Sequence, residues 1–206
     1  MPGTIDARLA ELGIDLPQGP APVANYVPFV VTGNLVFISG QVPLIDGKPQ
    51  YFGHLGDPHG VDEGYEAARF CGLNVIAQLR NACGGDLDRV VRVVKLVGFV
   101  ASTPAFTDAP KVVNGASDLM VEVFGEAGRH ARSAVGVSSL PLGVAVEVEA
   151  IFEIKRPVGL AARTHRAHLS FMLDNREAIS IGVIESLADI PASAWDACVG
   201  SSNPFV

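Results

Sequence analysis

The 206-residue chain has few cysteines, few basic residues and a single tryptophan. Its three cysteines, Cys71, Cys83 and Cys198, form no CxxC or other metal-binding pattern, and their odd number does not predict a disulfide framework. Lys and Arg number 15 against 22 Asp and Glu, so the formal net charge is −7. An acidic chain without basic clusters is a poor candidate for binding nucleic acid or an anionic membrane as its main partner.

Long apolar runs are missing as well. No run approaches the roughly 18 residues that would span a bilayer. The N-terminal MPGTIDARLAELGIDLP lacks the basic start and apolar stretch of a secretion signal. Because 49% of the residues are hydrophobic and 18% are charged, we expect most of the chain to fold. The expected protein is soluble and cytoplasmic, with no membrane partner.

The spacing of apolar residues predicts strands and helices in an irregular order. The N-terminal segment predicts a short amphipathic helix with Thr4 as its N-cap and Gly13 at its end. Residues 61–83 repeat apolar side chains every three or four positions, which predicts a long helix in which Cys71 and Cys83 are buried. The other predicted elements are a β-hairpin in 25–44 that turns at Thr32-Gly33-Asn34, a strand in 88–102, a helix within 103–128, and a closing pair of strands in 131–140 and 144–154.

Residues 45–60, IDGKPQYFGHLGDPHG, predict a loop with a short strand at its middle. His54 and His59 lie on either side of Asp57 here, and all three are residue types that bind metals. Their spacing matches no metal-binding motif, so we expect solvated histidines and no metal.

Together the elements predict an α+β fold, a single sheet with two helices packed on one face. Open sheet edges and the high apolar content favour an oligomer. The composition changes near residue 155, after which the chain is basic, weakly periodic and too poor in apolar surface for a core of its own. We therefore expect one domain with an N-terminal helical extension over 1–155, and a tail over 156–206 that packs on it or is partly disordered.

The stretch HARSAVGVSSLPLGVAVEVEA, residues 130–150, is mostly small and aliphatic but carries Arg132, Glu147 and Glu149. Alternation along a strand puts both glutamates on one face, so the pattern alone leaves them equivalent. Arg132 and Glu147 lie on consecutive predicted strands. A hairpin would join them in a structural cross-strand ion pair, whereas an interface would pair each with residues of a neighbouring chain.

This stretch closely resembles the signature of the RidA/YjgF enamine–imine deaminase family: Arg-Ser, alternating valines, Leu-Pro, a short turn and Val-Glu-Val-Glu-Ala. The earlier LVFISGQVPL resembles the family's Ser-Gly-Gln-Val/Ile-Pro element, and the resemblance covers residues 20–155. It implies a chorismate-mutase-like α+β fold with a single mixed sheet, and a homotrimer with a site at each subunit interface. The implied activity is the hydrolysis of reactive 2-imino and 2-enamino acids to 2-oxo acids and ammonia.

The resemblance also implies roles for particular residues. Arg132 corresponds to the arginine that binds the substrate carboxylate, and Glu147 to the glutamate that positions water. Ser39, Tyr26 and Asn114 correspond to further substrate-binding residues. An arginine can hold a carboxylate through two parallel hydrogen bonds, and a carboxylate near the imine carbon can orient water and accept its proton.

A protonated imine is already a good electrophile, so no metal and no organic cofactor is expected. The alternative to an enzyme is a non-enzymatic trimer that binds small carboxylates or a protein partner in a regulatory or chaperone-like role.

Overall fold

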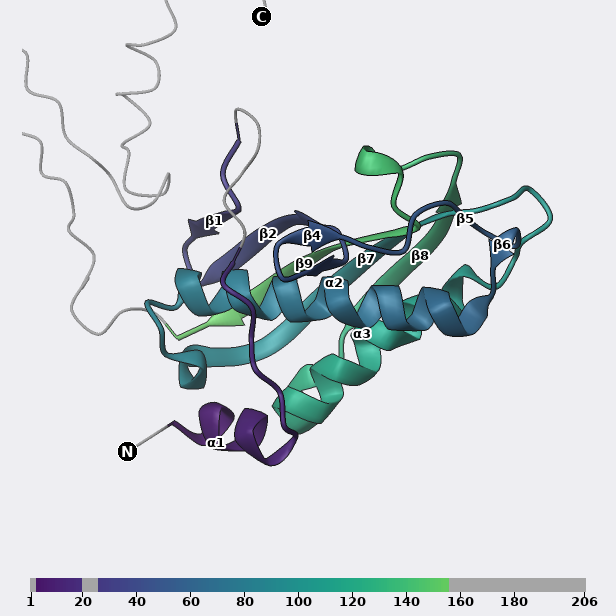
Figure 1. The fold of residues 1–206 in the computed structure, drawn as a ribbon. Helices are drawn as coiled ribbons and strands as arrows, with labels where there is room; N and C mark the ends of the chain where they lie inside the picture. The colour runs from purple at the N-terminus through teal and green to yellow at the C-terminus, as the bar shows by residue number, and fades with distance from the viewer. Residues whose placement is uncertain (1–2, 20–25, 156–206) are drawn as a thin grey trace, which may run out of the picture. The chain divides into compact units, whose positions relative to one another are not determined.

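The structure is a computed structural model that describes residues 3–19 and 26–155, and its central element is a five-stranded sheet (Figure 1). The strand order is β1-β2-β9-β7-β8, and all neighbours are antiparallel except β7 and β8, which are parallel. The strands are β1 (Phe29–Thr32), β2 (Leu35–Gln41), β7 (Val90–Ala101), β8 (Ala131–Val137) and β9 (Val146–Ile154).

Two long helices lie along one face of this sheet, α2 (Val61–Ala82) and α3 (Ala109–Phe124) (Figure 1). The shorter elements are the helix α1 (Thr4–Glu11), the 3-10 turns η1 (Leu87–Arg89), η2 (Gly125–Gly128) and η3 (Pro141–Gly143), and the two-residue strands β3 (Leu44–Ile45), β4 (Lys48–Pro49), β5 (His54–Leu55) and β6 (Pro58–His59). The predicted α+β fold, with a mixed sheet and two helices on one face, is confirmed. Residues 45–60 hold three of these short strands and part of a fourth, where one was predicted.

The predicted pairing of the last two strands is wrong, because β7 lies between β8 and β9. The chain leaves β7, passes through α3 and returns as β8, which pairs parallel with β7 along one of its edges. Parallel neighbours need such a crossover connection. From β8 the chain continues through the short segment with η3 to β9, which pairs with the other edge of β7. β9 then pairs antiparallel with both β7 and β2.

The ends of the helices follow local signals in part. In α2 the Glu63 carboxylate accepts a hydrogen bond from the backbone N–H of Gly60 (2.9 Å), and Gly84 follows the helix with a positive φ of 68°. Thr4 was predicted to be the N-cap of α1, but it is the first residue of the helix and Gly3 is the N-cap. The Asp88 carboxylate in η1 accepts from the N–H groups of Thr4 (2.8 Å) and Ile5 (2.9 Å), so a distant residue satisfies the free end of the helix.

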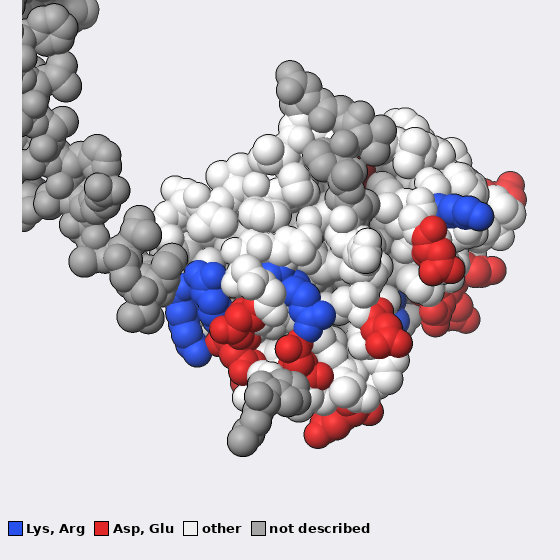
Figure 2. Space-filling view, turned by 60° about the vertical axis from the view of Figure 1, so that its left-hand side comes forward, with Lys and Arg blue, Asp and Glu red and all other residues white. Residues whose placement is uncertain are grey.

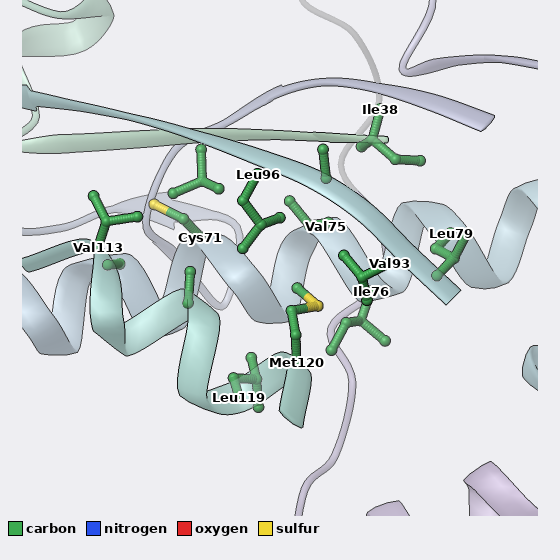
Figure 3. Close-up of a cluster of buried hydrophobic side chains, with 14 of the residues drawn as sticks. Ile38, Cys71, Val75, Ile76, Leu79, Val93, Leu96, Val113, Leu119 and Met120 are labelled. Carbon is green, nitrogen blue, oxygen red and sulfur yellow. The ribbon is translucent and has the colours of Figure 1, made fainter. Parts of the chain in front are cut away.

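The hydrophobic core lies between the sheet and the two long helices (Figure 3). Side chains from β2, β7, α2 and α3 meet there, among them Ile38, Cys71, Val75, Ile76, Leu79, Val93, Leu96, Val113, Leu119 and Met120. Cys71 and Cys83 are buried as predicted, and burial raises the pKa of both thiols. Cys198 and the tail over 156–206 lie outside the described residues, so the predicted boundary near residue 155 stays a prediction.

The closest approach between α2 and α3 is made by a glycine. A Cβ on Gly115 would overlap the backbone carbonyl of Tyr65, which cannot move without shifting α2. By contrast, a Cβ on Gly72 would meet the end of the Leu119 side chain at 2.9 Å, and such an end can rotate away. The two helices therefore pack at a spacing that only glycine at position 115 permits.

Replacing Gly115 by alanine is expected to lower the free energy of unfolding by about 1–3 kcal/mol, the usual cost of overpacking. Urea unfolding followed by circular dichroism measures this change. Gly72→Ala is the matched control: both variants gain the same helix propensity, but Gly72→Ala should cost less because the end of the Leu119 side chain can rotate away from the new methyl group. Equal effects of the two substitutions would contradict the assigned contact.

Candidate functional site

Arg132 lies on β8, with its side chain directed toward α3. In the parallel register it stands beside Leu96, which is fully buried beneath the helices. Its Nη1 donates hydrogen bonds to Asn114 Oδ1 (2.7 Å) and Ser117 Oγ (3.0 Å), and its Nη2 donates to the carbonyl of Pro110 (3.2 Å). A single helix, α3, thus supplies all three acceptors that orient the guanidinium.

These three acceptors are neutral, and Arg132 has no acidic partner among the described residues. A guanidinium has five N–H donors, of which two on Nη1 and one on Nη2 are used. The N–H on Nε and the second one on Nη2 have no acceptor within the part of the chain that the structure describes. The result is an oriented cation whose charge is not neutralised, which is what an anion-binding site requires.

Sequence reasoning found Asn114 but missed Ser117 and the carbonyl of Pro110. Asn114 and Ser117 are three residues apart on α3, and residues at that spacing share a helix face. That spacing is the signal that could have identified Ser117. No side-chain pattern could have identified the carbonyl, because every residue has one.

Glu147 lies on β9, on the sheet face opposite α2 and α3. Its neighbours in the strand, Val146 and Val148, are fully buried on the helix side, and its cross-strand partner is Phe99 of β7. The Glu147 carboxylate lies over the backbone of β2, where a Cβ on Gly40 would overlap it. The glycine of the Ser-Gly-Gln element therefore makes room for this carboxylate.

The pKa of Glu147 is raised above its ordinary value of 4.5, first by partial burial and then by repulsion from Glu149. Both causes disfavour the ionised form. Glu149 itself is exposed on the same sheet face. The environment thus separates the two glutamates that the sequence pattern left equivalent, since Glu147 is the less exposed of the two and lies against the backbone of β2.

Arg132 and Glu147 do not meet within one chain. Arg132 is level with Leu96 and Glu147 with Phe99, and residues three apart on a strand point to opposite faces. Two strand spacings and three residue rises put their Cα atoms roughly 14 Å apart. The structural ion pair considered from the sequence is therefore wrong, and the sheet separates the two side chains.

Ser39 lies on the Glu147 side of this division. The Ser39 hydroxyl donates a hydrogen bond to the carbonyl of Val27 (2.8 Å), and Ser39 directly precedes Gly40, which contacts Glu147. Tyr26 precedes Val27 and its side chain is half exposed. Four of the five predicted residues therefore fall into two groups, Arg132 with Asn114 on one side of the sheet and Glu147 with Ser39 on the other.

His54 is exposed and His59 is partly exposed, as predicted for histidines of a loop, and each ring also lies within hydrogen-bond distance of a backbone carbonyl. His54 Nε2 lies 2.9 Å from the carbonyl of Ser138, and His59 Nε2 lies 2.6 Å from that of Phe52. A cavity of about 630 Å³ opens beside His54, at the carboxyl ends of β7 and β8. None of the five predicted site residues lines it, and within the described ranges no group of three or more His, Cys, Asp or Glu side chains could share a metal ion.

Charged side chains of both signs lie next to one another on the surface. Figure 2 shows this on one face, where blue and red atoms adjoin near mid-height and below, while most of the upper part is uncharged. Ion pairs among the described residues include Arg8 with Glu11 and Arg69 with Glu122. None of the described helices is both long and apolar enough to cross a bilayer.

The mixed sheet with two helices on one face defines a chorismate-mutase-like α+β fold. Residues 6–154 match the family described as "YjgF/chorismate mutase-like, putative endoribonuclease", and the chain belongs to this family. Membership of the RidA/YjgF family, predicted from the two motifs, is thereby confirmed.

Relatives of the chain carry several names. It is 52% identical to Protein TCP17 of Trypanosoma cruzi over 153 residues, which cover 74% of this chain and 95% of the relative. It is 30% identical to a 2-iminobutanoate/2-iminopropanoate deaminase of Dermatophagoides farinae, with 69% and 95% of the two chains covered. A crystal structure of a protein of unknown function from Agrobacterium tumefaciens is 48% identical, covers 73% of this chain and 92% of its own, and superposes with a TM-score of 0.69.

The raised pKa of Glu147 makes its ionisation unfavourable in the folded state. Between the unfolded and the folded pKa, stability is lost as the pH rises, because the unfolded chain ionises more readily. Glu147→Gln removes this cost, so its melting temperature is expected to exceed that of the wild type at pH 7 and to approach it near pH 4. Thermal unfolding at the two pH values measures the difference, with Glu153→Gln as a control on the same strand. A lower melting temperature of Glu147→Gln at pH 7 would contradict this account.

Proposed function

We propose that the protein is a cofactor-independent deaminase that hydrolyses small 2-imino and 2-enamino acids to 2-oxo acids and ammonia. The observation that carries the proposal is the Arg132 guanidinium, which α3 orients through three neutral acceptors and no described acid neutralises. Its two remaining donors suit a carboxylate, which accepts two parallel hydrogen bonds from an arginine. The relative of Dermatophagoides farinae that is named a deaminase supports the substrate class.

Glu147 is the proposed base of the reaction. Water adds to the carbon of the protonated imine and loses one proton to the carboxylate, which passes it to the nitrogen. The C–N bond then breaks to release ammonia, while the remaining hydroxyl proton returns to the carboxylate and leaves a C=O group. A carboxylate with a pKa above its ordinary value accepts a proton more readily than a fully exposed one at the same pH. Glu149 is exposed and is not assigned a role in this reaction.

Both groups can reach one small substrate only if they come from different copies of the chain, because the sheet separates them within one copy. We therefore propose a homotrimer in which Arg132 and Asn114 of one subunit meet Glu147, Ser39 and Tyr26 of the next. Exposed apolar side chains on the helix-free sheet face support an interface there. They are Val30, Phe37 and Val135. Val30 pairs in register with Phe37, and Val135 pairs with Phe99, the cross-strand partner of Glu147.

A second candidate is a non-enzymatic trimer that binds small carboxylates or a protein partner through the same arginine. Carboxylate binding requires Arg132 alone, whereas hydrolysis also requires the base. A loss of turnover in Glu147→Gln without a loss of carboxylate binding therefore distinguishes the two candidates.

The direct test follows the decay of 2-iminopropanoate generated in situ by an amino-acid lyase. The wild type is expected to accelerate decay over buffer, Arg132→Ala to lower kcat/KM about 100-fold, and Glu147→Gln to lower kcat about 100- to 1,000-fold. Arg129→Ala is the matched control, since Arg129 is exposed and pairs only with Glu126, and it should change neither constant. No acceleration by the wild type with any of several imino acids would defeat the deaminase proposal.

The shared site has a separate test in subunit complementation. Arg132→Ala subunits keep Glu147 and Glu147→Gln subunits keep Arg132, so co-expressed and doubly affinity-purified mixed trimers contain some interfaces with both residues. Every mixed trimer contains one intact interface out of three, so activity should return toward about a third of that of the wild type. Inactive mixed trimers, or a monomeric mass by light scattering, would contradict a site shared between subunits.

A further inference from the structure

A chain of hydrogen bonds continues from Arg132 into the protein through Ser117 and His130. Ser117 Oγ accepts from Arg132 Nη1 (3.0 Å) and lies 3.0 Å from His130 Nε2. His130 Nδ1 lies 2.6 Å from the carbonyl of Gly128. Ser117 lies outside the motifs that identified the family, His130 precedes the Arg-Ser pair with which the signature begins, and both residues are only partly exposed.

The directions of these hydrogen bonds are fixed by chemistry. A carbonyl can only accept, so the proton of the imidazole lies on Nδ1 and is donated to Gly128. In the neutral ring Nε2 then carries a lone pair and accepts from the Ser117 hydroxyl. That hydroxyl has its lone pairs free for Arg132, so each donor in the chain has one acceptor.

From this geometry we propose that Ser117 and His130 are positioning residues that hold the Arg132 guanidinium in its carboxylate-binding orientation, and that they do so only while His130 is neutral. The inference rests on the proposed function, because it takes the carboxylate of a 2-imino acid as the ligand of Arg132.

Protonation of His130 breaks the order of the chain. Nε2 becomes a donor, so the Ser117 oxygen receives hydrogen bonds from two cations and its own proton loses its acceptor. The two positive charges also repel each other across one hydroxyl group. Arg132 is then held on α3 by Asn114 and the carbonyl of Pro110 alone.

The surroundings of His130 keep it neutral near pH 7. Its pKa is lowered, first by burial and to a smaller extent by the charge of Arg132, against an opposing effect of the hydrogen bond to Gly128. Three of the other charged side chains on the neighbouring elements have partners of their own: Glu126 with Arg129 in and after η2, Asp118 of α3 with Tyr65 of α2, and Arg92 of β7 with the carbonyl of Arg129. Lys95 of β7, which pairs in register with Ala131, is a further positive charge near His130 and also disfavours its protonation. We therefore expect the switch below pH 6.5.

The experiment measures KM and kcat for 2-iminopropanoate in Ser117→Ala, His130→Phe and His130→Gln across pH 5.5–8. Ser117→Ala and His130→Phe are expected to raise KM about tenfold at pH 7.5 with little change in kcat, which corresponds to about 1.4 kcal/mol of binding free energy. His130→Gln offers an amide oxygen to Ser117 and does not titrate. It should keep a KM near that of the wild type and lose the rise in KM that the wild type shows as the pH falls below 6.5.

His59→Gln is the matched control, because His59 also lies within hydrogen-bond distance of a backbone carbonyl but belongs to β6 and forms no hydrogen bond with Arg132, Ser117 or His130, all of which the structure describes. This variant should leave the pH profile of KM unchanged. Wild-type KM values in both Ser117→Ala and His130→Phe would overturn the positioning role while leaving the deaminase proposal intact. A wild-type KM that stays flat or falls below pH 6.5 would overturn the switch.

Failure of the proposed function itself is recognised by a wild type that does not accelerate imine decay. In that case calorimetric titration with pyruvate, a small 2-oxo acid, still tests the positioning role. Tighter binding by the wild type than by Ser117→Ala supports it, and equal dissociation constants overturn it. A wild type that neither accelerates decay nor binds pyruvate overturns both proposals.

Discussion

The parallel pairing of β7 with β8 is the constraint on which the rest of the structure depends. Because parallel strands require a crossover, α3 is placed directly beside the strand that carries Arg132. The same pairing occupies one side of β7 and leaves β9 to insert between β7 and β2. The position of the arginine, its three acceptors and its separation from Glu147 all follow from this one choice of neighbours.

The site combines two groups that the folded chain does not stabilise fully. Arg132 is oriented by neutral acceptors without a described counter-ion, and Glu147 is partly buried near a like charge that raises its pKa. Groups left in this state interact strongly with a ligand that supplies what is missing, a carboxylate for the arginine and a proton for the glutamate. The surface ion pairs elsewhere, such as Arg8 with Glu11, have already satisfied each other and offer nothing comparable.

Local signals predicted the elements well, and non-local pairing accounts for what was missed. Apolar periodicity located α2 and α3, and Gly33-Asn34 located the turn between β1 and β2, because these depend on residues close in sequence. The position of β7 between β8 and β9 depends on pairing between residues about 50 positions apart, such as Val97 and Glu149, and no local sequence pattern indicates it. The family resemblance pointed to Arg132, within a motif, and to Asn114, outside both motifs, whereas the contact of His130 depends on the fold, since α3 and the segment before β8 bring it within hydrogen-bond distance of Ser117.

The sheet also acts as a partition between two chemistries. Under the proposed function, substitutions on α3 would change how the carboxylate of the substrate is held, and substitutions around Gly40 would change the space available to Glu147. Because the sheet separates the two positions within one chain, the proposed anion site and the proposed base could be altered one at a time in an evolving family.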